Sequence, residues 1–172
     1  MKVIALTGHR PERLGLPDSV INSAWLPIRD WIRNVLLDEI EKSKEIEVFS
    51  GMASGSDIAM AIVACHLKHQ GYPIKLTCIC PFKGYGRKDR FYKYIMENSD
   101  NVINIHESWA RGCDNDRDEY MAKYCDVMLA IFDGHENGGV YSTIKKAEKY
   151  HKKILYCPKN LLNTNAYKPE LR

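Results

Sequence analysis

The chain has 172 residues, a formal net charge of +3 and 45% hydrophobic residues, a composition typical of a soluble globular protein and not of a disordered or fibrous one. This length favours one domain with a sizeable core. No run of 18 apolar residues is present to span a membrane, and no signal-like leader is evident. We therefore expect a cytoplasmic protein without a membrane partner, whose mild positive charge suits an anionic ligand but does not require nucleic acid.

Apolar strands alternate with helical segments along the whole chain. Strands are expected at 3–6, 46–49, 74–80, 102–105, 127–132 and 154–157, the third of them stopped by Pro81. Helices are expected at 20–40, where Pro27 would kink the helix or start a new one, and at 58–67, 91–96, 119–124 and 142–151. Continuously apolar strands form a mostly parallel sheet with helices on both faces. The pattern predicts a single doubly wound α/β domain over residues 1–158 and a C-terminal tail over 159–172.

Six cysteines are spread along the chain, and their spacing argues against a disulfide framework or a metal site. Cys78 and Cys80 alternate along an expected strand, so their side chains point to opposite faces. No Cys-x-x-Cys pair and no histidine cluster with ligand spacing occurs, as a metal site would require. We expect reduced, mostly buried thiols, no metal and no other cofactor.

Three small-residue loops follow strands and lead into helices. They are Thr-Gly-His-Arg-Pro at 7–11, Ser-Gly-Met-Ala-Ser-Gly-Ser-Asp at 50–57 and Gly-Gly-Val-Tyr-Ser-Thr at 138–143, the last expected to precede its helix. Such loops bind anions through accessible backbone and unpaired helix N–H groups. Ligands of doubly wound sheets bind outside the carboxyl ends of the strands, where these loops fall. The loops therefore predict one pocket for a phosphate-bearing small molecule.

The loops offer different chemistry to this pocket. The guanidinium of Arg10 suits a phosphate, with a solvated surface loop as the alternative. Asp57 suits either a ribose hydroxyl or a helix cap, a role that Ser54 or Ser56 could also fill, and the missing lysine after the glycines disfavours an ATPase. Asp133 could address ribose or simply form a turn with the glycine that follows. The expected ligand-binding residues are Thr7, Gly8, His9, Arg10, Ser50, Gly51, Met52, Ser54, Gly55, Asp57, Asp133, Gly138, Gly139, Tyr141, Ser142 and Thr143, with His9 or Tyr141 stacking on the base.

Two charged segments have alternative interpretations. Residues 83–93 interleave basic and aromatic side chains, a combination that can bind single-stranded nucleic acid, cover a nucleotide as a lid, or form the solvated start of a helix. We favour the last for most of these charges. The acidic residues of 114–119 surround Arg117 and are typical of a helix N-terminus.

Taken in order, these motifs resemble the SLOG superfamily, a Rossmann-like group named for the DNA-processing protein DprA (Smf) and the Lonely Guy phosphoribohydrolases. The closest similarity is to its YpsA-like branch, found in bacteria and their phages, and it extends over residues 2–158. It rests on the segments 7–11, 50–57, 117–121 and 126–139. The resemblance implies a SLOG-like domain that binds a nucleotide-derived ligand in a glycine-rich pocket. It also implies a homo-oligomer, in which a neighbouring subunit can contribute to that pocket.

The comparison with Lonely Guy enzymes bears on catalysis. Those enzymes cleave an N-glycosidic bond with an arginine on one helix and a glutamate after a Gly-Gly-x-Gly-Thr loop. Arg117 matches the arginine, but the loop here is one residue longer and two lysines stand where the glutamate is expected. A hydrolase would need another carboxylate, for which Asp57, Glu119 and Asp133 are candidates. The sequence thus favours binding of a phosphorylated nucleoside derivative for sensing or sequestration, with a nucleotide N-glycosidase as the alternative and DprA-like DNA binding as the third hypothesis.

Overall fold

The computed structural model describes residues 1–163 and 165–168, so the expected tail lies partly outside the described residues. Its strands are β1 (Lys2–Gly8), β2 (Ile46–Ser50), β3 (Ile74–Phe82), β4 (Asn101–His106), β5 (Val127–Ile131) and β6 (Lys153–Tyr156). Its helices are α1 (Pro11–Leu14), α2 (Leu26–Ser43), α3 (Ser56–His69), α4 (Tyr92–Asn98), α5 (Cys113–Tyr124) and α6 (Gly138–Lys149), with short 3₁₀ turns at Ser23–Trp25 and Lys159–Leu161. None of the helices in the described ranges is long and apolar enough to cross a membrane.

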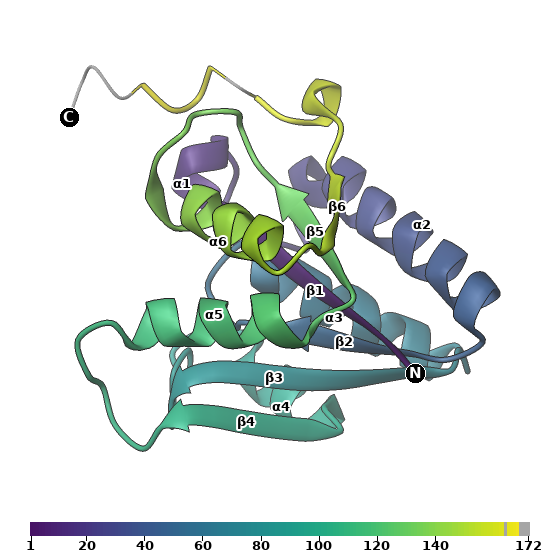
Figure 1. The fold of residues 1–172 in the computed structure, drawn as a ribbon. Helices are drawn as coiled ribbons and strands as arrows, with labels where there is room; N and C mark the ends of the chain where they lie inside the picture. The colour runs from purple at the N-terminus through teal and green to yellow at the C-terminus, as the bar shows by residue number, and fades with distance from the viewer. Residues whose placement is uncertain (164, 169–172) are drawn as a thin grey trace.

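The six strands form one sheet in the order β4-β3-β2-β1-β5-β6, and every adjacent pair is parallel. Figure 1 shows α5 and α6 in front of this sheet and α2, α3 and α4 behind it. Successive strand residues face opposite sides: Ile4 and Leu6 join the core under α2 to α4, whereas Ala5 joins the core under α5 and α6. The predicted doubly wound, Rossmann-like α/β fold with a parallel sheet is confirmed.

The strand order reverses between β1 and β5. From β1 the chain adds β2, β3 and β4 to one side of the sheet, and then places β5 and β6 on the other. The loops that leave β1 and β5 therefore diverge to opposite faces. Such a switch point leaves a crevice at the carboxyl ends of the strands, and this crevice holds the candidate site.

Two prolines act differently from one another. Pro27 is the second residue of α2 and does not kink it, because the first turn of a helix needs no N–H from its residues. Pro81 does not end the third strand as predicted, since β3 continues to Phe82. The ladder with β2 ends at Cys78, so Pro81 lies beyond the doubly paired part of β3, where a missing N–H is tolerated.

The last helix begins earlier than predicted. Gly138 and Gly139 form the first turn of α6 instead of a loop before it. Glycine is unfavourable in a helix interior, which is why the pattern placed the helix start at Ser142, but first-turn residues have no intrahelical N–H bond to lose. The N–H groups of these glycines are therefore those of the helix N-terminus itself.

The cysteines behave as predicted. All six are free and buried. Burial raises the pKa of Cys78 to about 12 and that of Cys65 to about 11. These thiols are packing groups of the core at neutral pH.

Candidate functional site

A cavity of about 360 Å³ lies at the carboxyl end of β1, between α1 and the N-terminal ends of α3, α5 and α6. Its lining residues are Leu6, Thr7, Gly8, His9, Arg10, Glu12, Arg13, Ala53, Asp57, Asp114, Arg117, Asp118, Met121, Gly139, Val140 and Thr143. Each of the three glycine-containing segments contributes to this lining. The sequence motifs that are far apart in the chain thus meet at one place on the sheet.

The cavity brings together only part of the expected site. The expected residues that line it are Thr7, Gly8, His9, Arg10, Asp57, Arg117, Gly139 and Thr143. Gly8 is required by packing, because a Cβ there would lie 2.4 Å from the Cβ of Ser56. This close approach sets the start of α3 against the end of β1, and so places Asp57 beside the β1 loop.

Several expected residues support the cavity wall from behind. Ser50 Oγ donates to the carbonyl of Asp57 at 2.8 Å. A Cβ on Gly51 would lie 2.8 Å from Asp57 Oδ2 and 3.0 Å from Arg117 Cδ, so this glycine lets both side chains approach. A Cβ on Gly55 would likewise lie 2.7 Å from Pro11 Cδ, so this glycine lets the two loops approach. These residues shape the cavity and do not line it.

The remaining expected residues lie elsewhere. Tyr141 stacks on Phe132 with ring centroids 6.2 Å apart, and Ser142 accepts a hydrogen bond from a lysine one turn later in α6. Glu119 accepts a hydrogen bond from the Tyr150 hydroxyl and does not line the cavity. Gly138 and Asp133 lie behind the lining, next to Arg13. Met52 and Ser54 line a second cavity.

Arg117 is the buried cation at the centre of the site. Its side chain projects from α5 and is 8% exposed. Its Nη1 donates to the Gly51 carbonyl at 2.7 Å and its Nε donates to Asp118 Oδ1 at 2.8 Å. Burial alone would lower the pKa of Arg117, but Asp118 and Asp57 outweigh burial and raise it. Arg117 is therefore a fixed positive charge that ties α5 to the loop after β2.

Asp57 lies at the start of α3 with 7% of the residue exposed. Burial raises its pKa to about 6, although Arg117 and the N–H of Ala53 act in the opposite direction. That N–H donates to Asp57 Oδ2 at 3.1 Å. The expectation that Asp57, Ser54 or Ser56 caps α3 is wrong: the N-cap is Gly55 and no side chain caps the helix. Ser56 Oγ instead donates to the carbonyl of His9 at 2.7 Å.

Arg13 is a site residue that the sequence reasoning missed. Its Nε and Nη2 donate to the two oxygens of Asp133 at 2.8 and 3.1 Å. Burial alone would raise the pKa of Asp133, but hydrogen bonds from Arg13 and from the His135 N–H lower it to about 2. Arg13 also donates to the carbonyls of His135 and Asn137, so it anchors the loop between β5 and α6. Its spacing of three residues from Arg10 was the available signal, but nothing in the sequence indicated the four-residue helix α1.

His9 is neutral at pH 7. Burial lowers its pKa to about 4, although the nearby Asp133 acts to raise it. Its Nε2 lies 3.2 Å from Asp133 Oδ1, an oxygen that also accepts a hydrogen bond from Arg13. The ring is tilted against Phe132 at 5.9 Å between centroids. The ring is thus a buried polar group at the cavity wall.

Two sources of positive potential in the cavity are not compensated. Asp133 pairs with Arg13 and Asp118 with Arg117, but Arg10 is exposed and forms no ion pair within the described residues. The Asn137 side chain does not cap α6, and the first-turn N–H groups of this helix carry the positive end of its dipole. Glu12, Asp57, Asp114 and Asp118 also line the cavity, so an anion is favoured at Arg10 and the start of α6 and not throughout the cavity.

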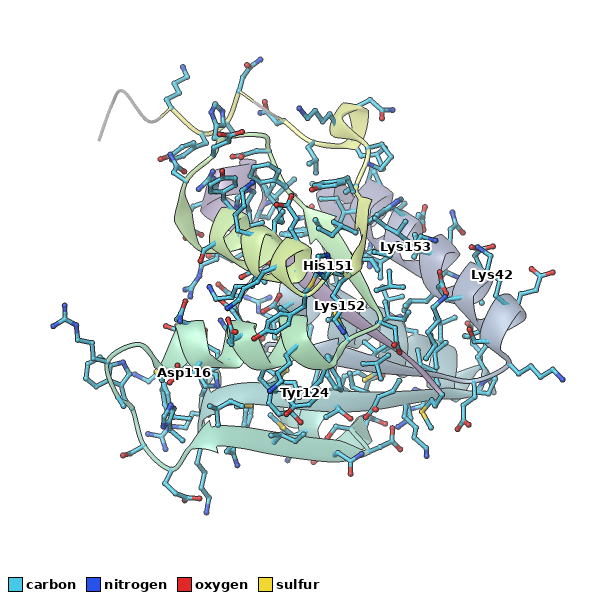
Figure 2. The ribbon with its side chains drawn as sticks, in the orientation of Figure 1. Lys42, Asp116, Tyr124, His151, Lys152 and Lys153 are labelled. Carbon is cyan, nitrogen blue, oxygen red and sulfur yellow. The ribbon has the colours of Figure 1, made fainter. Side chains whose placement is uncertain are left out.

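Other basic groups lie away from this site. Figure 2 shows His151, Lys152 and Lys153 together past the C-terminal end of α6. Asp116, in contrast, lies close to the start of α5. The charge at the carboxyl edge of the sheet is thus set by the loop residues and not by this basic cluster.

Comparisons with known proteins agree with this architecture. The family model described as the YspA SLOG family matches residues 4–164. A UPF0398 protein of Bacillus pumilus (strain SAFR-032) is 29% identical over 161 residues, covering 87% of this chain and 83% of the relative. UPF0398 proteins of Bacillus thuringiensis (strain Al Hakam) and Bacillus cereus (strain AH187) are 24% identical over 156 residues, covering 87% of this chain and 84% of each relative. The match spans the sheet and all three glycine-containing segments, and the chain therefore belongs to the YspA SLOG family, within a nucleotide-related superfamily.

Proposed function

We propose that the 360 Å³ cavity binds a phosphorylated nucleoside-derived small molecule, for sensing or sequestration. The observation that carries the proposal is the meeting at one switch-point cavity of Arg10, which forms no ion pair with a described residue, and the N-terminus of α6, which the Asn137 side chain does not cap. Phosphate is the ligand group that both features favour. The cavity volume is within the range of about 300–1,000 Å³ that small-molecule sites occupy.

The lining suggests a division of roles. Arg10 and the N–H groups of Gly139 and Val140 would hold the phosphate, with Thr143 beside them. The Asp57 carboxylate would accept hydrogen bonds from ribose hydroxyls. Leu6, Met121 and Val140 supply apolar surface for the base. Arg117, already bonded to Asp118 and Gly51, would contribute charge without moving.

The test is calorimetric titration with ribonucleoside and deoxyribonucleoside 5′-monophosphates. Substitution Arg10→Ala removes a charge-assisted bond worth about 1.5–3 kcal/mol, so affinity should fall at least tenfold. The matched control is Arg111→Ala, because Arg111 is also exposed but does not line the cavity. Equal losses in both variants, or no binding by the wild-type protein, would reject the proposal. Native mass spectrometry of the purified protein would identify a ligand that is already bound.

One observation favours N-glycosidase activity as a second candidate. Among the three carboxylates expected for such chemistry, Asp57 lines the cavity, whereas Glu119 does not and Asp133 is bound by Arg13. A carboxyl with a pKa of about 6 can give or take a proton near neutral pH. Release of free base from a nucleoside monophosphate, lost in Asp57→Asn but kept in Glu119→Gln, would establish the enzyme. Binding of the nucleotide without release of free base would reject the enzyme and leave the binding function as the one supported proposal.

A further inference from the structure

A second cavity of about 330 Å³ adjoins the candidate site. It is lined by Arg10, Met52, Ser54, Tyr85, Gly86, Lys88 and Asp89, from the loops that follow β1, β2 and β3. It therefore opens at the same carboxyl edge of the sheet as the first cavity. Met52 and Ser54, two of the expected site residues in segment 50–57, line this second cavity and do not line the first.

The second cavity is closely joined to the first. Arg10 lines both of them. Tyr85 lines the second cavity and Arg117 lines the first. The guanidinium carbon of Arg117 lies 5.7 Å from the centroid of the Tyr85 ring. Arg10, which forms no ion pair with any described residue, thus lies at the boundary between the two cavities.

The surroundings of the second cavity favour an anion next to an aromatic group. Lys88 is exposed and forms no ion pair within the described part of the chain, and Arg87 and Arg90 flank it in sequence. Asp89 is the one acidic residue of this lining, and its Oδ1 accepts a hydrogen bond from the Phe91 N–H at 2.8 Å. Tyr85 adds aromatic surface, and aromatic rings beside cations are how proteins hold bases next to phosphates.

The loop geometry keeps this cavity in place. Met52 is 1% exposed and has a positive φ of 63°, an uncommon conformation for a residue with a side chain. A Cβ on Gly86 would lie 3.2 Å from the Met52 carbonyl. The loop after β3 therefore packs directly on the loop after β2, and the wall between them is preformed.

We infer that the ligand has two parts, two nucleosides joined through a bridging diphosphate, with one half in each cavity, one phosphate at Arg10 and the other at Lys88. The inference rests on the proposed function and specifies its ligand class. A mononucleotide would occupy the first cavity and leave Lys88 without an anion. A dinucleotide would engage both sets of cations at once.

The experiment compares adenosine, guanosine, cytidine and uridine 5′-monophosphates with the symmetrical dinucleoside 5′,5′-diphosphates of the same bases, by calorimetry. In the wild-type protein at least one dinucleoside diphosphate should bind tenfold or more tightly than its monophosphate. In Lys88→Glu that advantage should disappear while the affinity for the monophosphate stays unchanged. The control is Lys83→Glu, since Lys83 is exposed in the same loop but does not line the cavity, and it should behave as wild type.

The outcomes separate the two proposals. Equal affinity for both ligand classes overturns the two-part ligand and leaves the proposed function in place. The two-part ligand is also overturned if Lys88→Glu lowers the affinity for monophosphates and for dinucleoside diphosphates by the same factor. A similar loss in Lys83→Glu, accompanied by tight and salt-sensitive binding of a single-stranded oligonucleotide, would assign this loop to nucleic acid and also overturn the inference. If the wild-type protein binds neither class, both proposals fail together.

Discussion

Asp57 makes the stability of the protein depend on pH in an unusual direction. Its pKa is about 6 in the folded protein and near its ordinary 3.8 in the unfolded chain. Between these values the folded state binds more protons than the unfolded state, so the Asp57 contribution to the free energy of unfolding increases as pH falls. A shift of this size corresponds to about 3 kcal/mol. The carboxyl is buried, which leaves little screening by solvent.

The measurement is urea unfolding of wild-type protein and Asp57→Asn at about pH 4.5 and about pH 7.5. The wild-type free energy of unfolding, relative to the variant, should be about 2 kcal/mol higher at the lower pH. The comparison is needed because His9 acts with the opposite sign: its folded pKa of about 4 is below the ordinary 6.5, so its contribution is lost as pH falls. A difference between wild type and variant that does not change with pH would contradict a raised pKa at Asp57.

The packing of α3 against β1 depends on Gly8, which has no side chain at the point where the two elements lie closest. Substitution Gly8→Ala would put a methyl group 2.4 Å from Ser56 Cβ, and such overpacking costs about 1–3 kcal/mol. Pairing it with Ser56→Gly removes the contact with Ser56 and leaves only the milder one with Ile131 Cβ at 3.0 Å. A double-mutant cycle measured by thermal unfolding should therefore give a favourable coupling energy between the two sites of about 0.5–3 kcal/mol. Simple additivity of the two substitutions would show that this contact does not fix how the helix meets the strand.

The secondary elements could be predicted from the sequence where a pattern was long. β5 is buried at every position, and its continuous apolar run indicated a central parallel strand. α1 has only four residues and no periodicity to detect, so Arg13 was missed along with it. Its bond to Asp133 joins residues 120 positions apart, and such a contact exists only once the fold is known. The same holds for Asp118, whose place beside Arg117 in the cavity depends on how α5 packs.

Protection of the whole molecule against hydrogen exchange should follow the order of the sheet. β1 and β5 are interior strands and mostly buried, whereas β4 and β6 are edge strands with exposed residues. Amides of β4 and β6 should exchange first, because edge strands open at lower free energy than the core. Adding a bound nucleotide should slow exchange at residues 8–10 and 138–140. Added protection confined to the amino-terminal edge would contradict the placement of the site.

The homo-oligomer implied by the family resemblance stays a prediction. Sedimentation velocity with and without nucleotide tests it directly. A shift of the association equilibrium with ligand would indicate that a second subunit contributes to the cavity.

Strand polarity also decides where the protein can be attached to a support. Met1 is 58% exposed and precedes β1 at the amino-terminal edge, the edge opposite the cavities (Figure 1). Tyr167, near the other terminus, has its ring 4.1 Å from the guanidinium carbon of Arg13 in the cavity lining. A biosensor chip that captures the chain by Met1 leaves both cavities open to analyte, whereas attachment at Tyr167 would bring the chip surface against Arg13 and the first cavity.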